Sequence, residues 1–411
     1  MTVTDTRAAA ATEPTSAPAG WAAAWRVGLV ALAVLSAFVG LRLALHDGDV
    51  SVFVLAGDEV TDPAAAPANL HVEPGVRGYD GQAFYRLARN PLTAERTEFG
   101  IGFARPEYRH QRIAYPAAAW LLAAGGREPL VPTALVVVNL LAGAAIAALA
   151  ARIALDAGRS PWLGLIPAGW AGYLIALSLD LSEVLAGALL LAALLALRRE
   201  RWGWAAASLV ALGFTRETGL LLVAALVAVQ AWDVLVRWRR DGERPWTVRR
   251  PAGVPRWVGV VPIVAYGAWR LALHAWWVGT PPTEPSSDFL TVPFVRLGQR
   301  LVELLGDPAA LSDPGALGLL VTVAVVAVAA FGLAQRDAGR PWERLALLAF
   351  LLLFAASPVW DLDVTYLRWA NDTVTVGWVL ALAASRERVR TFASLTAVAF
   401  ALTAAVWIPF P

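Results

Sequence analysis

The chain has 411 residues, of which 58% are hydrophobic and only 16% charged, and its mean hydropathy is +0.57. Soluble domains carry about 25% charged residues, so the composition excludes an ordinary soluble protein and indicates an all-α, polytopic membrane protein. The net charge is +2, and every one of the 34 basic residues is Arg. The sequence contains no Cys, and this absence excludes a disulfide framework, a thiolate nucleophile and a Cys-based metal site.

The predicted elements begin with a tail and an anchor. Residues 1–20 are polar and rich in Ala, Thr and Pro, and we expect a disordered cytoplasmic tail. Residues 21–45 are apolar over the length that a bilayer requires, which predicts a retained signal anchor. Residues 21–411 form one transmembrane domain in this interpretation. Further apolar runs bring the expected total to about eleven spans, at 131–152, 161–178, 183–198, 202–215, 219–236, 256–278, 314–335, 344–357, 370–385 and 391–409.

The distribution of Arg predicts the orientation of these spans. By the positive-inside rule, the Arg-rich connections should be cytoplasmic; they are 198–201, 237–256, 336–344 and 386–390. The segments that remain outside are 46–130, 179–183, 215–218, 279–313 and 358–369. This scheme requires the short, Pro-containing stretch 113–124 to lie at the interface without crossing.

Two outward segments, 46–130 and 279–313, are longer than ordinary connectors, which indicates a function. Within them, residues 80–91 and 289–305 place apolar side chains at helical spacing, with charged side chains on another face. Both patterns predict amphipathic, juxtamembrane helices on the outer membrane surface.

The first amphipathic stretch opens with a candidate catalytic acid in the sequence GYDGQAFYRLA, residues 78–88. An ionised Asp80 at the membrane edge could accept a proton from an acceptor hydroxyl. It could equally cap its helix by accepting backbone N–H bonds, and spacing alone leaves both roles open. Tyr79 and Tyr85 suit interfacial anchors as well as sugar-stacking platforms; with Gln82, we include them among the candidate substrate-binding residues.

An Arg-rich stretch follows in the sequence RPEYRHQRIAYP, residues 105–116. Arg105, Arg109 and Arg112 would meet a phosphate at headgroup level through bidentate contacts, and Tyr115 lies directly beyond them. Attraction to anionic lipid headgroups is the alternative. The four His, at positions 46, 71, 110 and 274, have no metal-ligand spacing.

Further charged residues fall at predicted outward ends of spans. Charges at membrane depth are expensive and commonly face an internal cavity, so we expect these residues to bind substrate: Asp180, Glu183, Arg216, Glu217 and Arg368. Arg216 with Glu217 could instead be a structural ion pair that holds a hairpin. The D-x-D spacing of Asp361 and Asp363 is a weak metal signal. A divalent cation is therefore possible, but no metal ligand or cofactor is assigned.

The layout resembles the GT-C superfamily of membrane glycosyltransferases, which use polyprenyl-phosphate sugars. Four features match that family in order along the chain: the acid and aromatic of Asp80 and Tyr85, the Pro-containing helix 115–124, the acidic turn 180–183, and the T-[KR]-x-x-G-like hairpin 215–219. The sequences YDGQAFYRLARNP and RHQRIAYP resemble a bacterial branch linked to cell-surface glycopolymers. Gly81 stands where several relatives have a second acid, which leaves metal dependence open.

The resemblance implies a GT-C-like fold in the bacterial plasma (inner) membrane, with the active site facing the periplasm or exterior. It implies that Asp80 is the catalytic base and that Arg residues hold the phosphate of a polyprenyl-phosphate sugar donor. The acceptor would be the hydroxyl of a glycan, lipid or protein; membrane lipids are expected partners and nucleic acid is not. The alternatives are a transporter or flippase of a lipid-linked glycan, or a non-catalytic scaffold in glycopolymer assembly.

Overall fold

The computed structural model describes residues 17–283, 290–307, 314–334, 339–357, 360 and 365–409. The fold is 73% helical, and the strands of the described residues are each two residues long. The helices are α1 (Ala17–Leu45), α2 (Asp80–Arg89), α3 (Pro106–His110), α4 (Ala114–Leu122), α5 (Val131–Asp156), α6 (Leu165–Ala168), α7 (Ala171–Ser178), α8 (Glu183–Arg198), α9 (Trp202–Thr215), α10 (Leu220–Asp241), α11 (Arg256–Trp276), α12 (Val295–Gly306), α13 (Pro314–Ala330), α14 (Pro341–Ala355), α15 (Thr365–Trp369), α16 (Asn371–Ala381) and α17 (Arg386–Trp407).

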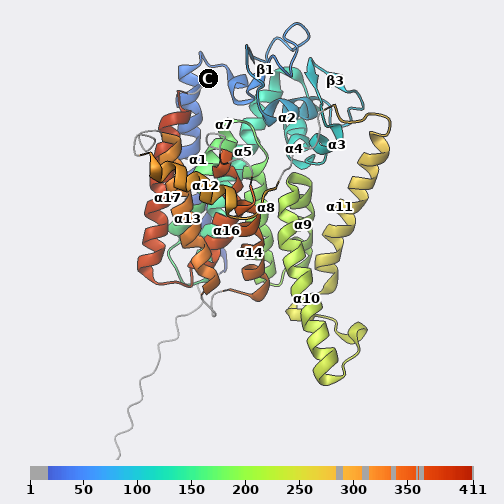
Figure 1. Ribbon diagram of the computed structural model, residues 1–411, viewed down its shortest axis with the longest axis vertical. Helices are drawn as coiled ribbons and strands as arrows, with labels where there is room; N and C mark the ends of the chain where they lie inside the picture. The colour runs from blue at the N-terminus through green and yellow to red at the C-terminus, as the bar shows by residue number, and fades with distance from the viewer. Residues whose placement is uncertain are drawn as a thin grey trace, which may run out of the picture.

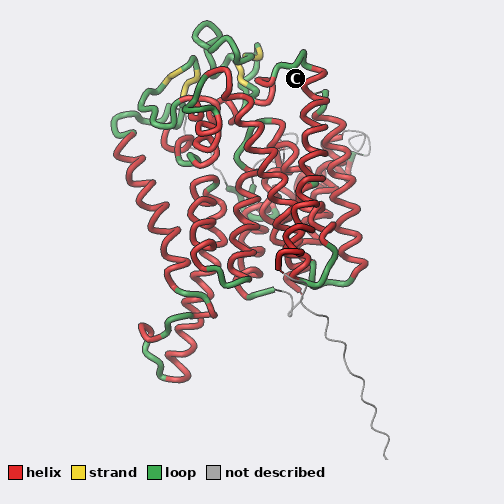
Figure 2. The backbone as a smooth tube through the Cα atoms, turned by 180° about the vertical axis from the view of Figure 1, so that it is seen from behind, coloured by secondary structure: helices red, strands yellow, loops and turns green. Residues whose placement is uncertain are grey.

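The strands pair in two small ribbons within the loop region 46–130. β1 (Ala56–Gly57) pairs in parallel with β2 (Val72–Glu73), and β3 (Thr97–Glu98) pairs antiparallel with β4 (Ile101–Gly102). Figure 2 shows these strands gathered at one end of the helical bundle. The structure is therefore a helical bundle with one elaborated end.

Several helices are long and apolar enough to cross a bilayer, which confirms the prediction of an all-α membrane protein. Within the described part of the chain there are six, at Gly20–Leu45, Glu128–Asp156, Glu217–Asp241, Arg256–Trp276, Gly315–Ala334 and Arg386–Trp407. The expected count of about eleven spans is not confirmed. Helices α8 and α14 have 16 and 15 residues, or about 24 and 22 Å at 1.5 Å per residue, against a hydrocarbon core of about 30 Å.

The expected span 161–178 is interrupted. Its residues form a short 3-10 turn followed by α6 and α7, which are separated at Gly169 and Trp170. Trp170 has an extended backbone and a fully buried side chain, and its indole nitrogen donates to Asn371 Oδ1 at 2.9 Å. The break therefore places an aromatic side chain in the core, where its one donor finds an acceptor.

The core is built on tight contacts between apolar helices. α5 packs against both α1 and α8, and α8 also packs against α9. Small residues let these helices approach closely: a Cβ added at Gly143 of α5 would lie 2.4 Å from the side chain of Leu35 on α1. The nearly uniform apolar character of α5 fits its central position, because most of its residues are buried.

The two ends of the bundle carry different structures. Arg198, at the end of α8, pairs with Glu343 of α14 at 2.6 Å, and Arg159 donates to the carbonyl of Leu382. These residues belong to or adjoin the connections for which the sequence predicts a cytoplasmic location, and they meet at one end. The region 46–130, with α2, α3 and α4, forms the opposite end (Figure 1). The structure is consistent with the predicted topology, while the side of the membrane stays a prediction.

The outer-loop region is anchored on the bundle through α2 and α4. α4 has nine residues, about 14 Å, which is too short to cross a bilayer. Tyr115 is fully buried: its hydroxyl donates to the carbonyl of Leu135, accepts from Asn139, and its ring packs edge-on against Phe84 of α2. The second expected amphipathic helix is present as α12, which buries Leu297 and Leu304. It begins at Val295, later than the expected 289–305, because residues 290–294 are not helical; position 289 lies outside the described residues.

Candidate functional site

Two glycines position the start of α2. Gly78 has a φ of +70°, and a Cβ at Gly81 would lie 2.5 Å from the carbonyl oxygens of both Val54 and Leu179. Because no side chain fits there, the first turn of α2 lies directly against the turn before α8. Asp80 therefore stands at the junction between the outer loops and the bundle.

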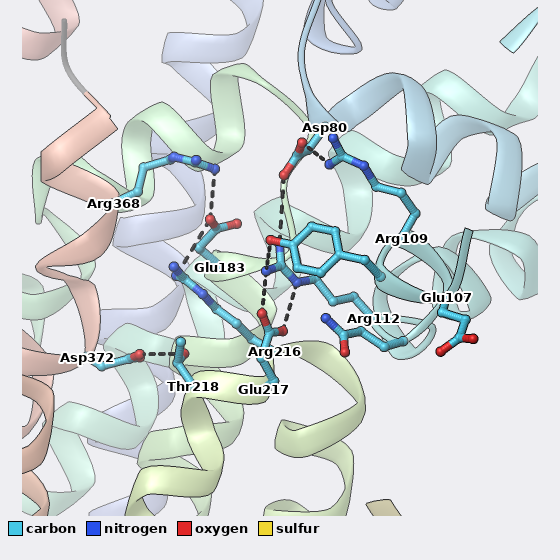
Figure 3. A network of polar contacts seen from close by, with 12 residues as sticks. Asp80, Glu107, Arg109, Arg112, Glu183, Arg216, Glu217, Thr218, Arg368 and Asp372 are labelled. Atoms are coloured by element: carbon cyan, nitrogen blue, oxygen red, sulfur yellow. Dashed lines mark hydrogen bonds and ion pairs between the residues drawn. The ribbon is translucent and has the colours of Figure 1, made fainter. Parts of the chain in front are cut away.

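Asp80 occupies the first helical position of α2, and Tyr79 is the N-cap residue. The Asp80 carboxylate pairs with Arg109 through Oδ1, and its Oδ2 lies 3.7 Å from Arg112 Nη1. A carboxylate is also favoured here by the positive end of the helix dipole. The arrangement departs from a simple capping role, because the carboxylate is directed at two guanidinium groups of the neighbouring segment (Figure 3).

Arg112 links Asp80 to the hairpin between α9 and α10. Its Nε and Nη2 donate to the two carboxylate oxygens of Glu217 at 2.9 and 2.5 Å. This bidentate geometry is among the strongest that Arg and a carboxylate form. A third acceptor, the hydroxyl of Tyr108, lies 3.0 Å from Nη2. Arg112 is thus fixed in one orientation with its side chain only 13% exposed.

A second cluster lies beside the first and is centred on Glu183. Its Oε1 is 2.9 Å from Arg368 Nη1 and 3.6 Å from Arg216 Nη1. Figure 3 shows Arg368 and Arg216 approaching this carboxylate from different elements. All three side chains are at least nine-tenths buried. The Arg216 contact is longer than a hydrogen bond, and the Nε of Arg216 is buried without a hydrogen-bond partner among the described residues.

The two clusters are joined by further contacts. The guanidinium of Arg368 lies over the Tyr79 ring, 4.8 Å from its centroid, and Thr218, next to Glu217, donates to Asp372 at 3.0 Å. Elements that are distant in the sequence therefore converge at the start of α8. They are the start of α2, α3, the α9–α10 hairpin and α15. The result is a group of Arg and carboxylate side chains at the elaborated end of the bundle, buried around Glu183 and partly exposed around Asp80.

The electrostatics of Asp80 follow from this group. Burial raises the pKa of its carboxyl, but the guanidinium groups of Arg109, Arg112 and Arg368 outweigh burial and hold the pKa well below its usual range. Asp80 is therefore ionised at physiological pH. While it is paired with Arg109 it is also a weak base, so its strength depends on what Arg109 contacts.

Comparison with known proteins supplies no family. No protein-family model matches the chain, and no curated protein or solved structure is significantly similar to it. The function must therefore be argued from the site itself.

The structure brings together most of the predicted site residues. Those that share the converging group are Tyr79, Asp80, Arg109, Arg112, Glu183, Arg216, Glu217 and Arg368. Gln82, Tyr85 and Tyr115 instead make contacts that hold the loops, although Gln82 also lines the cavity beside Asp80. Gln82 accepts from Thr61 at 2.7 Å and donates to the carbonyl of Arg77, while the hydroxyl of Tyr85 donates to Asn69.

Asp180 also lies apart from the group. It is fully buried, has a φ of +48°, and neither carboxylate oxygen has a hydrogen-bond partner within the part of the chain that is described. Burial raises the pKa of Asp180 well above its usual range, and the charge of Arg42 offsets this only partly. Asp180 therefore does not share the ion pairs that join the Arg residues to Asp80, Glu183 and Glu217 in the described part of the chain.

A cavity opens beside Asp80, and it contains residues that the sequence did not single out. Its volume is about 370 Å³, within the range of small-molecule sites, and its lining includes Arg77, Tyr108 and Arg109. The Tyr108 ring lies 5.0–5.7 Å from the guanidinium groups of Arg105, Arg109 and Arg112. The sequence held one signal for this contact, because Arg105 and Arg112 stand three and four positions from Tyr108, the spacing at which side chains of a helix meet. Nothing comparable in the sequence marked Arg77.

The weak metal signal at Asp361 and Asp363 lies outside the described residues. Across the segments that are described, no group of three or more His, Cys, Asp or Glu side chains could hold a metal ion. His110 illustrates a structural His: its Nε2 lies 2.8 Å from the carbonyl of Pro91 and its Nδ1 accepts from Trp277. It joins α3 to the end of α11.

Proposed function

We propose that this protein is a membrane glycosyltransferase of the GT-C type, which moves a sugar from a polyprenyl-phosphate donor to an acceptor hydroxyl. The observation that carries the proposal is the position of Asp80. Its carboxylate lines the outer cavity and also contacts the first of two buried Arg clusters. A candidate proton acceptor is thus placed between a space for one substrate and a group of cations suited to a phosphate.

The reaction would proceed as a direct displacement. The acceptor oxygen attacks the anomeric carbon and its proton passes to the Asp80 carboxylate. The bond between the anomeric carbon and the donor phosphate oxygen breaks, and its electron pair stays on the phosphate. One displacement inverts the anomeric configuration. The protein's main contributions are therefore to position the two reactants and to stabilise the charge that develops on the phosphate.

The buried cations support a phosphate site. Among the described residues, the one ion pair of Arg216 within 4 Å is its long contact to Glu183, and Arg368 shares that same carboxylate. An incoming phosphate offers these guanidinium groups better-placed oxygen acceptors, in the bidentate geometry that Arg favours. The donor's lipid tail would remain in the bilayer beside the apolar helices.

The enzyme interpretation is favoured over a transporter by the distribution of charge. A transporter of a lipid-linked glycan needs polar side chains along a path between the two membrane faces. The buried ion pairs of the described residues instead fall into separate groups, one around Asp80 and Glu183 and another around Glu343 at the other end.

The proposal is tested by replacing Asp80 and by varying the donor. Asp80→Asn retains the size of the side chain and its suitability for the helix start, so the variant should insert normally while transfer falls by about 10²-fold or more, as expected for a lost general base. Asp62→Asn, an exposed change in the same outer loop, is the matched control and should be silent. Turnover is measured with purified protein, a polyprenyl-phosphate sugar and, in parallel, a nucleotide sugar.

Two results would contradict the proposal. Near-normal transfer by the Asp80→Asn variant would mean that another group takes the proton. If the protein turned over the nucleotide sugar but not the lipid-linked donor, the Arg clusters could not be the site that binds a polyprenyl phosphate.

A further inference from the structure

The outer cavity lies on one side of Asp80, and the Glu183 cluster is not part of its lining. The cavity is enclosed by the start of α2, the β4 strand and its following loop, and α3. Asp80 and Tyr79 are shared between the two regions, whereas Glu183, Arg216 and Arg368 contact only the buried cluster. If the buried cluster holds the donor phosphate, the cavity is the remaining space from which an acceptor can reach Asp80.

The charge of this cavity is strongly asymmetric. Its described lining contains three guanidinium groups, those of Arg77, Arg105 and Arg109, and one carboxylate, that of Asp80. Formal charges therefore sum to +2, in a loop region otherwise rich in acids. A neutral sugar needs hydrogen-bonding side chains and aromatic faces, but it does not need three cations around one small cavity.

Two of these cations are arranged around an aromatic ring. The guanidinium carbons of Arg105 and Arg109 lie 5.1 and 5.7 Å from the centroid of Tyr108, within the range of cation–π contacts. Such stacking limits the rotamers of both side chains, so less conformational entropy is lost when their N–H groups bind a ligand. The cavity therefore presents partly preorganised donors.

We propose that this cavity binds the acceptor, and that the acceptor is an anionic sugar, with a phosphate or carboxylate group near the hydroxyl that reacts. This inference rests on the proposed glycosyltransferase function and adds a substrate class to it. Arg77 and Arg105 bind the anionic group, and the neighbouring hydroxyl is directed toward Asp80 at the inner end of the cavity.

Arg109 gives this arrangement a second consequence. It lines the cavity and also pairs with Asp80, so an anion in the cavity competes with Asp80 for the same guanidinium. When Arg109 turns to the bound anion, the Asp80 carboxylate loses a cationic partner and becomes a stronger proton acceptor. A neutral acceptor leaves the Asp80–Arg109 pair intact. The anionic group thus contributes to binding and to activation of the base.

The test measures binding without a donor, so that it does not depend on turnover. Purified full-length protein is titrated calorimetrically with glucose 6-phosphate, glucuronate and methyl glucoside as probes, and with inorganic phosphate and glycerol 3-phosphate to distinguish a free phosphate or a lipid headgroup from a sugar. We expect the two anionic sugars to bind more tightly than the neutral glucoside and the two non-sugar phosphates. Added salt should weaken their binding.

Variants locate the binding site. Arg105→Gln and Arg77→Gln should each weaken glucose 6-phosphate binding by about tenfold or more, the scale of one lost charge-assisted hydrogen bond, while Arg105→Lys should retain part of the affinity. Arg127→Gln removes an exposed cation of the same 46–130 region that is not part of the cavity lining, and it is the matched control: glucose 6-phosphate should still bind. A thermal melt of each variant separates lost binding from lost folding. If Arg105→Gln does not fold, Arg77→Gln and Arg105→Lys test the same binding site.

Three outcomes would overturn the inference. The neutral glucoside could bind as tightly as the anionic sugars, the affinity could be insensitive to both Arg77 and Arg105, or glycerol 3-phosphate could bind as well as glucose 6-phosphate. If the protein still transfers sugar from the lipid-linked donor at a normal rate, any of these outcomes refutes the anionic acceptor and leaves the proposed function standing. Tight, Arg105-dependent binding in a protein that transfers no sugar would instead refute the proposed function.

Discussion

Glu183 offers the sharpest test of how the buried Arg clusters are held together. Its carboxylate is the described acid nearest to both Arg216 and Arg368, at 3.6 and 2.9 Å, and its side chain is only 4% exposed. Glu183→Gln preserves the shape of the side chain but removes the negative charge. Two buried guanidinium groups then face each other across a neutral amide, and the desolvation cost of both charges is no longer offset.

The magnitude follows from the burial of this pair. Removing one partner of a buried ion pair typically costs about 3–5 kcal/mol, because the other charge stays buried and uncompensated. At roughly 2 °C per kcal/mol, this corresponds to a fall in Tm of about 6–10 °C. The same change also raises the local charge by one unit. Inorganic phosphate or pyrophosphate should therefore bind the variant more tightly than the wild type and recover part of the lost stability.

Glu343→Gln is the matched control for this experiment. Glu343 is fully buried, pairs with Arg198 at 2.6 and 3.0 Å, and lies at the opposite end of the bundle. It should lose a similar amount of stability, but phosphate should give it no extra protection, and its transfer rate per folded molecule should be retained. The assay is a thermal melt of each purified variant, with and without phosphate. Equal rescue of both variants, or no destabilisation of Glu183→Gln, would refute the assignment of this cluster as an anion site.

Three other predictions concern the glycine contact, pH and topology. Gly81→Ala should destabilise by about 1–3 kcal/mol through overpacking, because the new Cβ would lie 2.5 Å from two backbone oxygens, whereas Gly267→Ala, with open space around it, should be neutral or slightly stabilising in a thermal melt. Since the pKa of Asp80 is depressed in the folded state, its contribution to stability is present above about pH 4 and is lost as the pH falls further. The fall in Tm on acidification should therefore be smaller for Asp80→Asn than for the wild type. Identical dependence of Tm on pH in the two proteins would contradict the pairing. Single cysteines at Ala65 and Thr247 of this Cys-free chain should react with an impermeant thiol reagent from outside only at Ala65, and the reverse pattern would invert the proposed topology.

The positions of the helices were largely predictable from the sequence. The apolar runs 183–198 and 202–215 coincide with α8 and α9, and the nine-residue α4 falls within the stretch expected not to cross. A helix satisfies its own backbone hydrogen bonds, so its presence depends on local apolar length and composition. The number of crossings was less predictable. The expected span 161–178 is interrupted at Trp170, whose side chain donates a hydrogen bond to Asn371 at the start of α16.

The type of site was also visible in the sequence, since charged residues at outward ends of spans are costly unless they face one another. Their partners were not. Asp80 and Glu217 are far apart in the chain, and only the packing of α2 and α3 beside the α9–α10 hairpin lets Arg112 contact both. Asp180 is three residues from Glu183 and looked equivalent to it, yet it is fully buried and its carboxylate oxygens have no hydrogen-bond partner among the described residues.

Composition and the spacing of apolar residues thus determined that this is a helical membrane protein with charged residues at the ends of its apolar segments. The tertiary structure alone decided which charges meet, because an ion pair depends on distances of a few ångströms between side chains that local sequence does not relate. It also decided that a cationic cavity adjoins Asp80, since the lining residues from Arg77 to Arg109 face one space only when α2, β4 and α3 pack together.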